Sequence, residues 1–163
     1  MKTLTLFALL AFGSLPLAAH AGTDLSKLST MKKPGEWQMT VTRKMEIPGT
    51  KMSIPPKTAT QKKCITQKDL DKISNFTHKN INGMSCKMIK KDLSGKTFTY
   101  TMKCTGSSNQ LQMDGQTVFD SKDASHSHIQ MTGNVNNMPM HITMDVTSKR
   151  IGECTPEPKK QGG

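Results

Sequence analysis

Three histidines and one aspartate near the C-terminus have side chains and spacings that suit a metal ion: His126, His128, His141 and Asp145. The two segments that carry them alternate apolar with polar residues, which predicts the two strands of a hairpin. We expect Ile129 to lie opposite Ile142, which places the three imidazoles and the carboxylate together on the outer face. Same-face neighbours along a strand are about 6.6 Å apart, so two imidazoles could bind one copper or zinc ion. The alternative interpretation is an ordinary solvated sheet face.

The chain has 13 methionines, most of them on alternate positions of strand-like segments. Thioethers are good ligands for Cu(I), and Met138, Met140 and Met144 are close in sequence to the histidines. The alternation, however, places the methionines on the inward face and the histidines on the outward face. Flexible thioethers also fill apolar interiors, so a second hypothesis is a concave apolar face that takes up an apolar or amphipathic ligand. We expect four methionines to line it: Met39, Met88, Met102 and Met113.

Four cysteines are present, and in an exported protein an even number predicts two disulfides. The sequence permits three pairings. A turn near Ser94–Gly95 would place Cys86 opposite Cys104 in a hairpin, and the second bridge would then join Cys64 to Cys154. The alternative is a four-thiolate zinc site, although the spacings lack the close cysteine pairs of such sites.

The formal net charge is +11, and only two of the 23 basic residues are arginines. We expect Lys87 and Lys103 to face outward side by side in the disulfide-bonded hairpin, with Lys62 and Lys63 in the same basic surface. Such a surface could dock on lipid head groups or another anionic component of the cell envelope, or it could simply aid solubility. Nucleic acid is a poor partner, because arginines and aromatic residues interleaved with the lysines are scarce.

Motifs of catalysis are missing from the sequence, which contains no GxSxG, no HExxH and no phosphate-binding glycine loop. Ser127 and His128 combine a nucleophile with a base, but adjacent residues on a strand point to opposite faces. Oxidised cysteines would not serve as nucleophiles. We therefore expect a protein that is not an enzyme and has no cofactor, unless copper or zinc binds.

The N-terminal residues 1–21 have the pattern of a secretory signal peptide, with Lys2, an interrupted apolar run and Ala19-His20-Ala21. The run is too short to span a bilayer comfortably, and no later segment could anchor the chain. The expected organisation is a signal peptide at 1–21, a flexible lead-in at 22–33, one β-rich domain at 34–154 and a disordered tail at 155–163.

Alternation predicts strands over 36–47 and 57–65, and only Arg43 interrupts the apolar face of the first. Thr66 can cap a short helix over Gln67–Ile73. The second half contains five more alternating segments separated by turn signals, so consecutive strands should pair antiparallel.

One buried face and one wet face indicate a mainly β protein. We expect a curved antiparallel meander, or a small barrel-like sheet, of about seven strands with one short helix. A two-sheet sandwich is the alternative.

Several segments together resemble the exported bacterial family called domain of unknown function 3617. They are Pro34-Gly35-Glu36-Trp37, Ile54-Pro55-Pro56, Cys64-Ile65-Thr66, Tyr100-Thr101-Met102-Lys103-Cys104 and Arg150-Ile151-Gly152-Glu153-Cys154. The resemblance covers about residues 34–154. It implies a compact domain in the envelope of Gram-negative bacteria and supplies no catalytic residue.

The leading functional hypothesis is a non-enzymatic binding role in the periplasm, toward an apolar or amphipathic ligand or an anionic envelope surface. Copper or zinc binding through the last hairpin is the alternative. A structural role, or protection against oxidants by sacrificial methionines, is the third. The oligomeric state is left open.

Overall fold

The computed structural model describes residues 25–50, 53–74, 78–81 and 83–155. The predicted signal peptide and residues 156–163 of the predicted tail lie outside the described residues.

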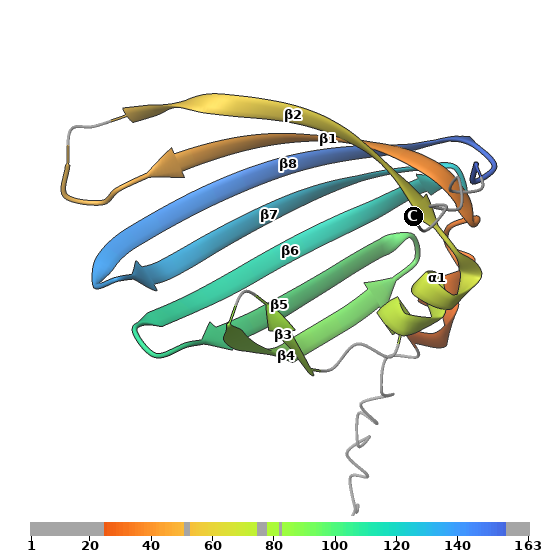
Figure 1. Ribbon diagram of the computed structural model, residues 1–163. Coiled ribbons are helices and arrows are strands. Elements are labelled where there is room, and N and C mark those ends of the chain that lie inside the picture. The colour runs from red at the N-terminus through yellow and green to blue at the C-terminus, as the bar shows by residue number, and fades with distance from the viewer. Residues whose placement is uncertain (1–24, 51–52, 75–77, 82, 156–163) are drawn as a thin grey trace, which may run out of the picture.

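In the described part of the chain, eight strands form one antiparallel sheet in the order β2-β1-β8-β7-β6-β5-β4-β3 (Figure 1). The strands are β1 (Gly35–Glu46), β2 (Ser53–Ile65), β3 (His78–Ile81), β4 (Met84–Ser94), β5 (Thr97–Thr105), β6 (Asn109–Ser121), β7 (Ala124–Val135) and β8 (Met138–Gly152). The mainly β class with one short helix, α1 (Gln67–Ser74), is confirmed. The sandwich alternative is wrong, because all eight strands belong to a single sheet.

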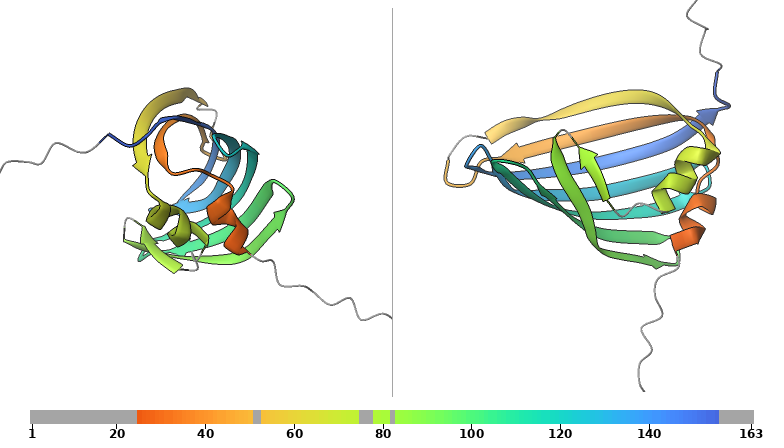
Figure 2. Two further views of the ribbon diagram at one scale, coloured as in Figure 1. Left: turned by 90° about the vertical axis from the view of Figure 1, so that its right-hand side faces the viewer. Right: turned by 60° about the horizontal axis from the view of Figure 1, so that its bottom comes forward.

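The sheet curls into an open, barrel-like trough whose two edge strands are β2 and β3 (Figure 2). The 3-10 helix η1 (Leu25–Thr30) and α1 lie together at one end of the trough, which we call the helix end. We call the inner surface of the trough the concave face. Among the described residues, no helix is long and apolar enough to cross a membrane.

Local chemistry explains the hairpins and the helix. Asn136 and Asn137 adopt positive φ angles of 50° and 62°, which builds a two-residue turn of type I′ between β7 and β8. Thr66 and Asp69 form a capping box, because each backbone N–H is hydrogen-bonded to the other's side chain, at 3.1 Å and 3.3 Å. The helix therefore begins where the sequence predicts.

The least local pairing joins β1 to β8, with Val41 opposite Val146. The prediction that consecutive strands of the second half pair antiparallel is confirmed from β4 to β8. β2 and β3 are opposite edges of the sheet, and the β1–β2 hairpin lies beside the last strand.

Both predicted disulfides are present. Cys86 and Cys104 face each other across β4 and β5 and close a separation of 18 residues. Cys64, near the end of β2, bonds to Cys154 just beyond β8 and closes a separation of 90 residues. The first bridge fixes the β4–β5 hairpin. The second links the end of β2 to the end of β8, the two strands that lie on either side of β1. With all four cysteines paired, a four-thiolate zinc site is excluded.

One buried cluster lies at the helix end. Leu25 and Leu28 of η1 are 7% and 4% exposed and pack against Phe98 and Phe119 of the sheet. The predicted flexible lead-in at 22–33 is thus wrong from residue 25 onward, because two leucines spaced three apart form one face of a helical turn and cover aromatic rings. A second buried cluster contains Cys86, Met102 and Cys104.

Trp37 of β1 is fully buried close to η1. Its Nε1 donates to the Lys33 carbonyl oxygen at 3.1 Å, and the Lys32 ammonium lies 4.3 Å from the ring centroid. Burial lowers the pKa of Lys32 to about 8, because desolvation disfavours the charged amine. Contacts to the Trp37 indole therefore help to hold the segment between η1 and β1.

Candidate ligand-binding face

The histidines of the last hairpin do not assemble the predicted metal site. Ile129 lies opposite Met144 instead of Ile142, because the turn is the Asn136–Asn137 pair and shifts the register by two residues. The predicted inward and outward faces are kept, since a two-residue shift preserves alternation. His141 is opposite Thr132 as a result, and three cross-strand pairs lie between it and His128.

Each of these histidines instead has its own acidic neighbour on the outer face. His126 Nδ1 is 3.0 Å from Asp120, and His128 Nδ1 is 2.7 Å from Asp145. His141 Nδ1 lies 3.9 Å from Glu46, and its Nε2 is buried without a hydrogen-bond partner among the described residues. No group of three histidine, cysteine or acidic side chains close enough to hold a metal ion occurs in the described part of the chain. The structure therefore gives copper or zinc no assembled ligand set there.

The predicted basic surface is assembled only in part. Lys87 and Lys103 are opposite each other and exposed, as expected. Lys62 and Lys63 lie on β2, with β1, β8, β7 and β6 between them and β5 in the sheet. As neighbours on a strand they also point to opposite faces. The four lysines do not form one patch along the sheet surface.

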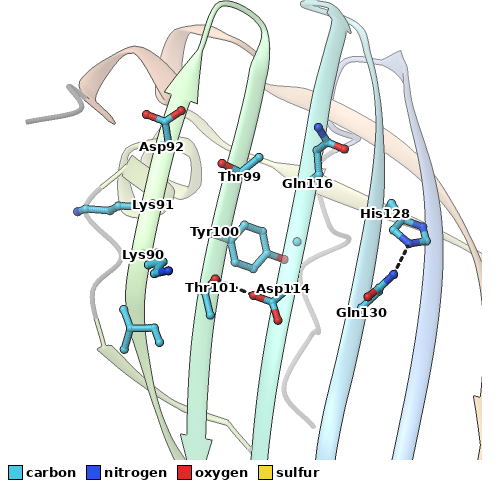
Figure 3. A pocket seen from close by; sticks show the side chains of 12 residues that line it. Lys90, Lys91, Asp92, Thr99, Tyr100, Thr101, Asp114, Gln116, His128 and Gln130 are labelled. Atoms are coloured by element: carbon cyan, nitrogen blue, oxygen red, sulfur yellow. Dashed lines mark hydrogen bonds between the residues drawn. The ribbon is translucent and has the colours of Figure 1, made fainter.

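A hollow of about 880 Å³ lies on the outer side of the sheet, over β4 to β7. Figure 3 shows its polar side chains spread over the strands, with Thr101 bonded to Asp114 and Gln130 to His128. Asp114 also accepts from Gln112 at 2.8 Å, and these hydrogen bonds lower the pKa of its carboxyl. The polar groups at the centre of this hollow are thus already partnered within the protein.

The concave face carries most of the methionines. In one cross-strand row, each side chain lies opposite the next on the neighbouring strand, and we call it the methionine row: Met45 (β1), Ile142 (β8), Met131 (β7), Met113 (β6), Met102 (β5) and Met88 (β4). Three of the four predicted lining residues are therefore adjacent. Met39, the fourth, is on the same face of β1, closer to the helix end and opposite Ser148.

Most side chains of this face are more exposed than those of the core. Met102 is 7% exposed, whereas Met45, Met113, Met131 and Ile142 are half-buried. Met138, at the start of β8, is 57% exposed. The fully buried clusters lie at the helix end and under the β4–β5 disulfide. An apolar surface is consequently left open along β1, β8, β7 and β6.

The cross-strand row next to the methionine row contains Gly115, and the ring of Tyr100 covers this glycine. Tyr100 lies opposite Gly115, and a methyl group added at that glycine would meet the phenol ring at 2.3 Å. The hydroxyl donates to Met113 Sδ at 3.8 Å, and burial raises the pKa of Tyr100. The glycine therefore makes room for a ring that lies flat on the concave face.

Two neighbouring cations, one on β1 and one on β2, interrupt this apolar surface. Arg43 of β1 lies opposite Met144 on one side and Lys57 of β2 on the other. Both cations line a pocket of about 230 Å³ with Met45, Ile54 and Pro55. Neither cation has an ion pair with a carboxylate of the described residues. The sequence signal was the single break at Arg43 in the apolar alternation of β1, but its pairing with Lys57 required the register.

Comparison with known proteins gives a family and no activity. The family model described as a protein of unknown function (DUF3617) matches residues 32–154. No curated protein matches the chain. The match spans every strand, both disulfides and α1, in agreement with the resemblance read from the sequence. The chain therefore belongs to the DUF3617 family.

Proposed function

We propose that the protein binds an apolar or amphipathic molecule on its concave face, and that it does so in the periplasm without catalysing a reaction. The observation that carries the proposal is the methionine row, a line of apolar side chains that crosses six strands and is half-buried over most of its length. Contiguous apolar surface on a soluble domain marks a binding site. Covering it with an apolar ligand gains about 25 cal/mol for each Å² removed from water.

The side-chain types support a ligand of variable shape. Methionine has three rotatable bonds and a polarisable sulfur, so it adapts to an irregular apolar partner. Val41, Ile129 and Val146 extend the same face toward the helix end. A rigid core would use branched and aromatic residues in place of the methionines of the methionine row.

A non-catalytic role fits the distribution of titratable groups. The histidines of β7 and β8 occupy outward positions, where each lies beside a carboxylate of the outer face. General acid–base catalysis requires such groups within hydrogen-bond reach of the ligand. The two disulfides favour an oxidising compartment, and the N-terminal sequence 1–21 would provide export.

Binding of N-phenyl-1-naphthylamine, an uncharged probe whose fluorescence rises in apolar surroundings, tests the proposal. The variant Met131→Gln places an amide in the middle of the methionine row. Losing part of one methionine contact costs about 1 kcal/mol, so the Kd should rise about fivefold. Thr132→Gln is the matched control, because it introduces the same side chain at the next position, on the outer face.

We expect Met131→Gln to bind the probe more weakly than the wild type and Thr132→Gln to bind it with unchanged affinity. Both variants should have a Tm close to that of the wild type. Absence of probe binding to the wild-type protein would refute the proposal. An equal effect of both substitutions would also refute it, since the probe would then not occupy the concave face.

A further inference from the structure

We propose that the ligand is an anionic amphiphile whose head group is bound by Arg43 and Lys57 while its single chain lies along the concave face. This inference rests on the proposed function and specifies the ligand's chemical class. It draws on four observations: the position of the two cations, their lack of a counter-charge, the distribution of acidic residues, and the apolar path that begins beside them.

Arg43 and Lys57 are direct cross-strand neighbours on β1 and β2. Like charges directly opposite each other destabilise a strand pair, and here both side chains line the same 230 Å³ pocket. The pairing shifts between Arg43 and Met45, so a bulge shapes this pocket. A carboxylate or phosphate placed between the two cations would remove their repulsion, and the planar guanidinium can bind two of its oxygens.

The acidic side chains that could have neutralised the pair are on the other face of the sheet. Every acidic residue of the described strands occupies a position that alternates with the inward apolar ones: Glu36, Glu46, Asp92, Asp114, Asp120 and Asp145. The nearest in sequence, Glu46, is bonded to Lys44 at 2.8 Å and faces His141. The concave face thus combines apolar side chains with cations and carries no acid along its described strands, which complements an apolar chain with an anionic head.

An apolar path leads away from the cations across the sheet. From Arg43 the same cross-strand row continues through Met144, Ile129, Gly115 and Tyr100, on β8, β7, β6 and β5. The methionine row runs beside it. Four inter-strand steps of about 4.8 Å cover roughly 19 Å, whereas one acyl chain fills about half of a ~30 Å bilayer core. One membrane-length chain therefore fits between the cations and Tyr100.

The test measures binding of four probes to the full chain without its signal peptide. Palmitate and 1-palmitoyl-lysophosphatidylglycerol present anionic heads, hexadecanol presents a neutral one, and N-phenyl-1-naphthylamine reports the apolar face alone. The variants are Arg43→Gln/Lys57→Gln and the conservative Arg43→Lys. Lys62→Gln is the control, since it removes a charge from another residue of β2, one whose side chain points outward.

We expect the wild type to bind at least one anionic probe tenfold or more tightly than hexadecanol, and the double variant to lose that preference while keeping its affinity for N-phenyl-1-naphthylamine. Arg43→Lys should retain part of the preference, and Lys62→Gln all of it. The anion bound more tightly identifies the head group as carboxylate or phosphate. Equal affinity of the wild type for anionic and neutral probes, or a double variant that binds anions as the wild type does, would overturn the inference while leaving the proposed function standing. A wild type that binds none of the four probes would overturn both.

Discussion

Replacing Gly115 by alanine should destabilise the protein, even though alanine normally suits a strand better than glycine. The reason is Tyr100, whose ring lies over the glycine on the concave face. An added Cβ would come within 2.3 Å of the ring's Cζ and within 2.5 Å of its hydroxyl oxygen. The ring would have to leave its place, and with it the contact between its hydroxyl and Met113.

The magnitude follows from two opposing effects. Forcing a side chain out of a packed position costs about 1–3 kcal/mol. Removing a glycine from a strand recovers about 0.5–1 kcal/mol, and this recovery is available because Gly115 is not among the glycines with positive φ. The net loss should therefore be about 1–2 kcal/mol, which for a domain of this size lowers the Tm by roughly 4–10 °C.

Thermal denaturation followed by circular dichroism checks this expectation in a double-mutant cycle. In a Tyr100→Val background the ring is gone, so Gly115→Ala should become neutral or stabilising by up to about 1 kcal/mol. The diagnostic result is that the stability change caused by Gly115→Ala loses or reverses its sign when Tyr100 is absent. A similar loss of stability in both backgrounds would refute the reasoning, because the cost would then not come from Tyr100.

Three further expectations concern other parts of the fold. Serine substitution of the Cys64–Cys154 bridge should cost about 4–5 kcal/mol, against about 3 kcal/mol for the shorter bridge, as measured by urea unfolding; equal or reversed losses would contradict the loop-length argument. Leu28→Ala should lower the free energy of unfolding by about 2–5 kcal/mol, since Leu28 is 4% exposed, and a change under 1 kcal/mol would show that η1 does not stabilise the fold. Because burial lowers the pKa of Lys32 to about 8 from 10.5, the folded protein releases this proton before the unfolded chain does. Stability relative to Lys32→Met should then rise between about pH 8 and 10.5, and a stability difference that is constant with pH would contradict the shift.

The concave face also explains an unusual composition. Methionine provides more of the apolar positions beyond residue 21 than any other residue type, yet the fully buried clusters contain only one methionine, Met102. The methionines of β1, β6, β7 and β8 lie where the sheet is covered incompletely. Their abundance therefore describes a surface as much as a core, and it matches a site whose occupant is flexible.

Alternation along the chain determined which residues share a face, because successive side chains of a strand point to opposite sides whatever the strand pairs with. That rule placed the methionines inward and the histidines outward correctly. It also placed Cys86 opposite Cys104, since the Ser94–Gly95 turn is local. The capping residue Thr66 located α1 for the same reason.

Register and long-range pairing were decided only in the tertiary structure. The two left-handed asparagines moved the β7–β8 register by two residues and separated His141 from the other histidines. The pairing of β1 with β8 joins segments about a hundred residues apart, for which alternation contains no information.

The candidate site depends both on the alternation in the sequence and on the strand pairing in the tertiary structure. The sequence by itself determined an apolar face interrupted at Arg43, because period-two alternation is a property of the backbone. The same alternation places every acid of the described strands on the other face, but only the folded sheet decided that Lys57 stands beside Arg43. It also decided that curvature leaves the methionine row partly open. Those features depend on which strands become neighbours, and that is a balance of packing over the whole chain.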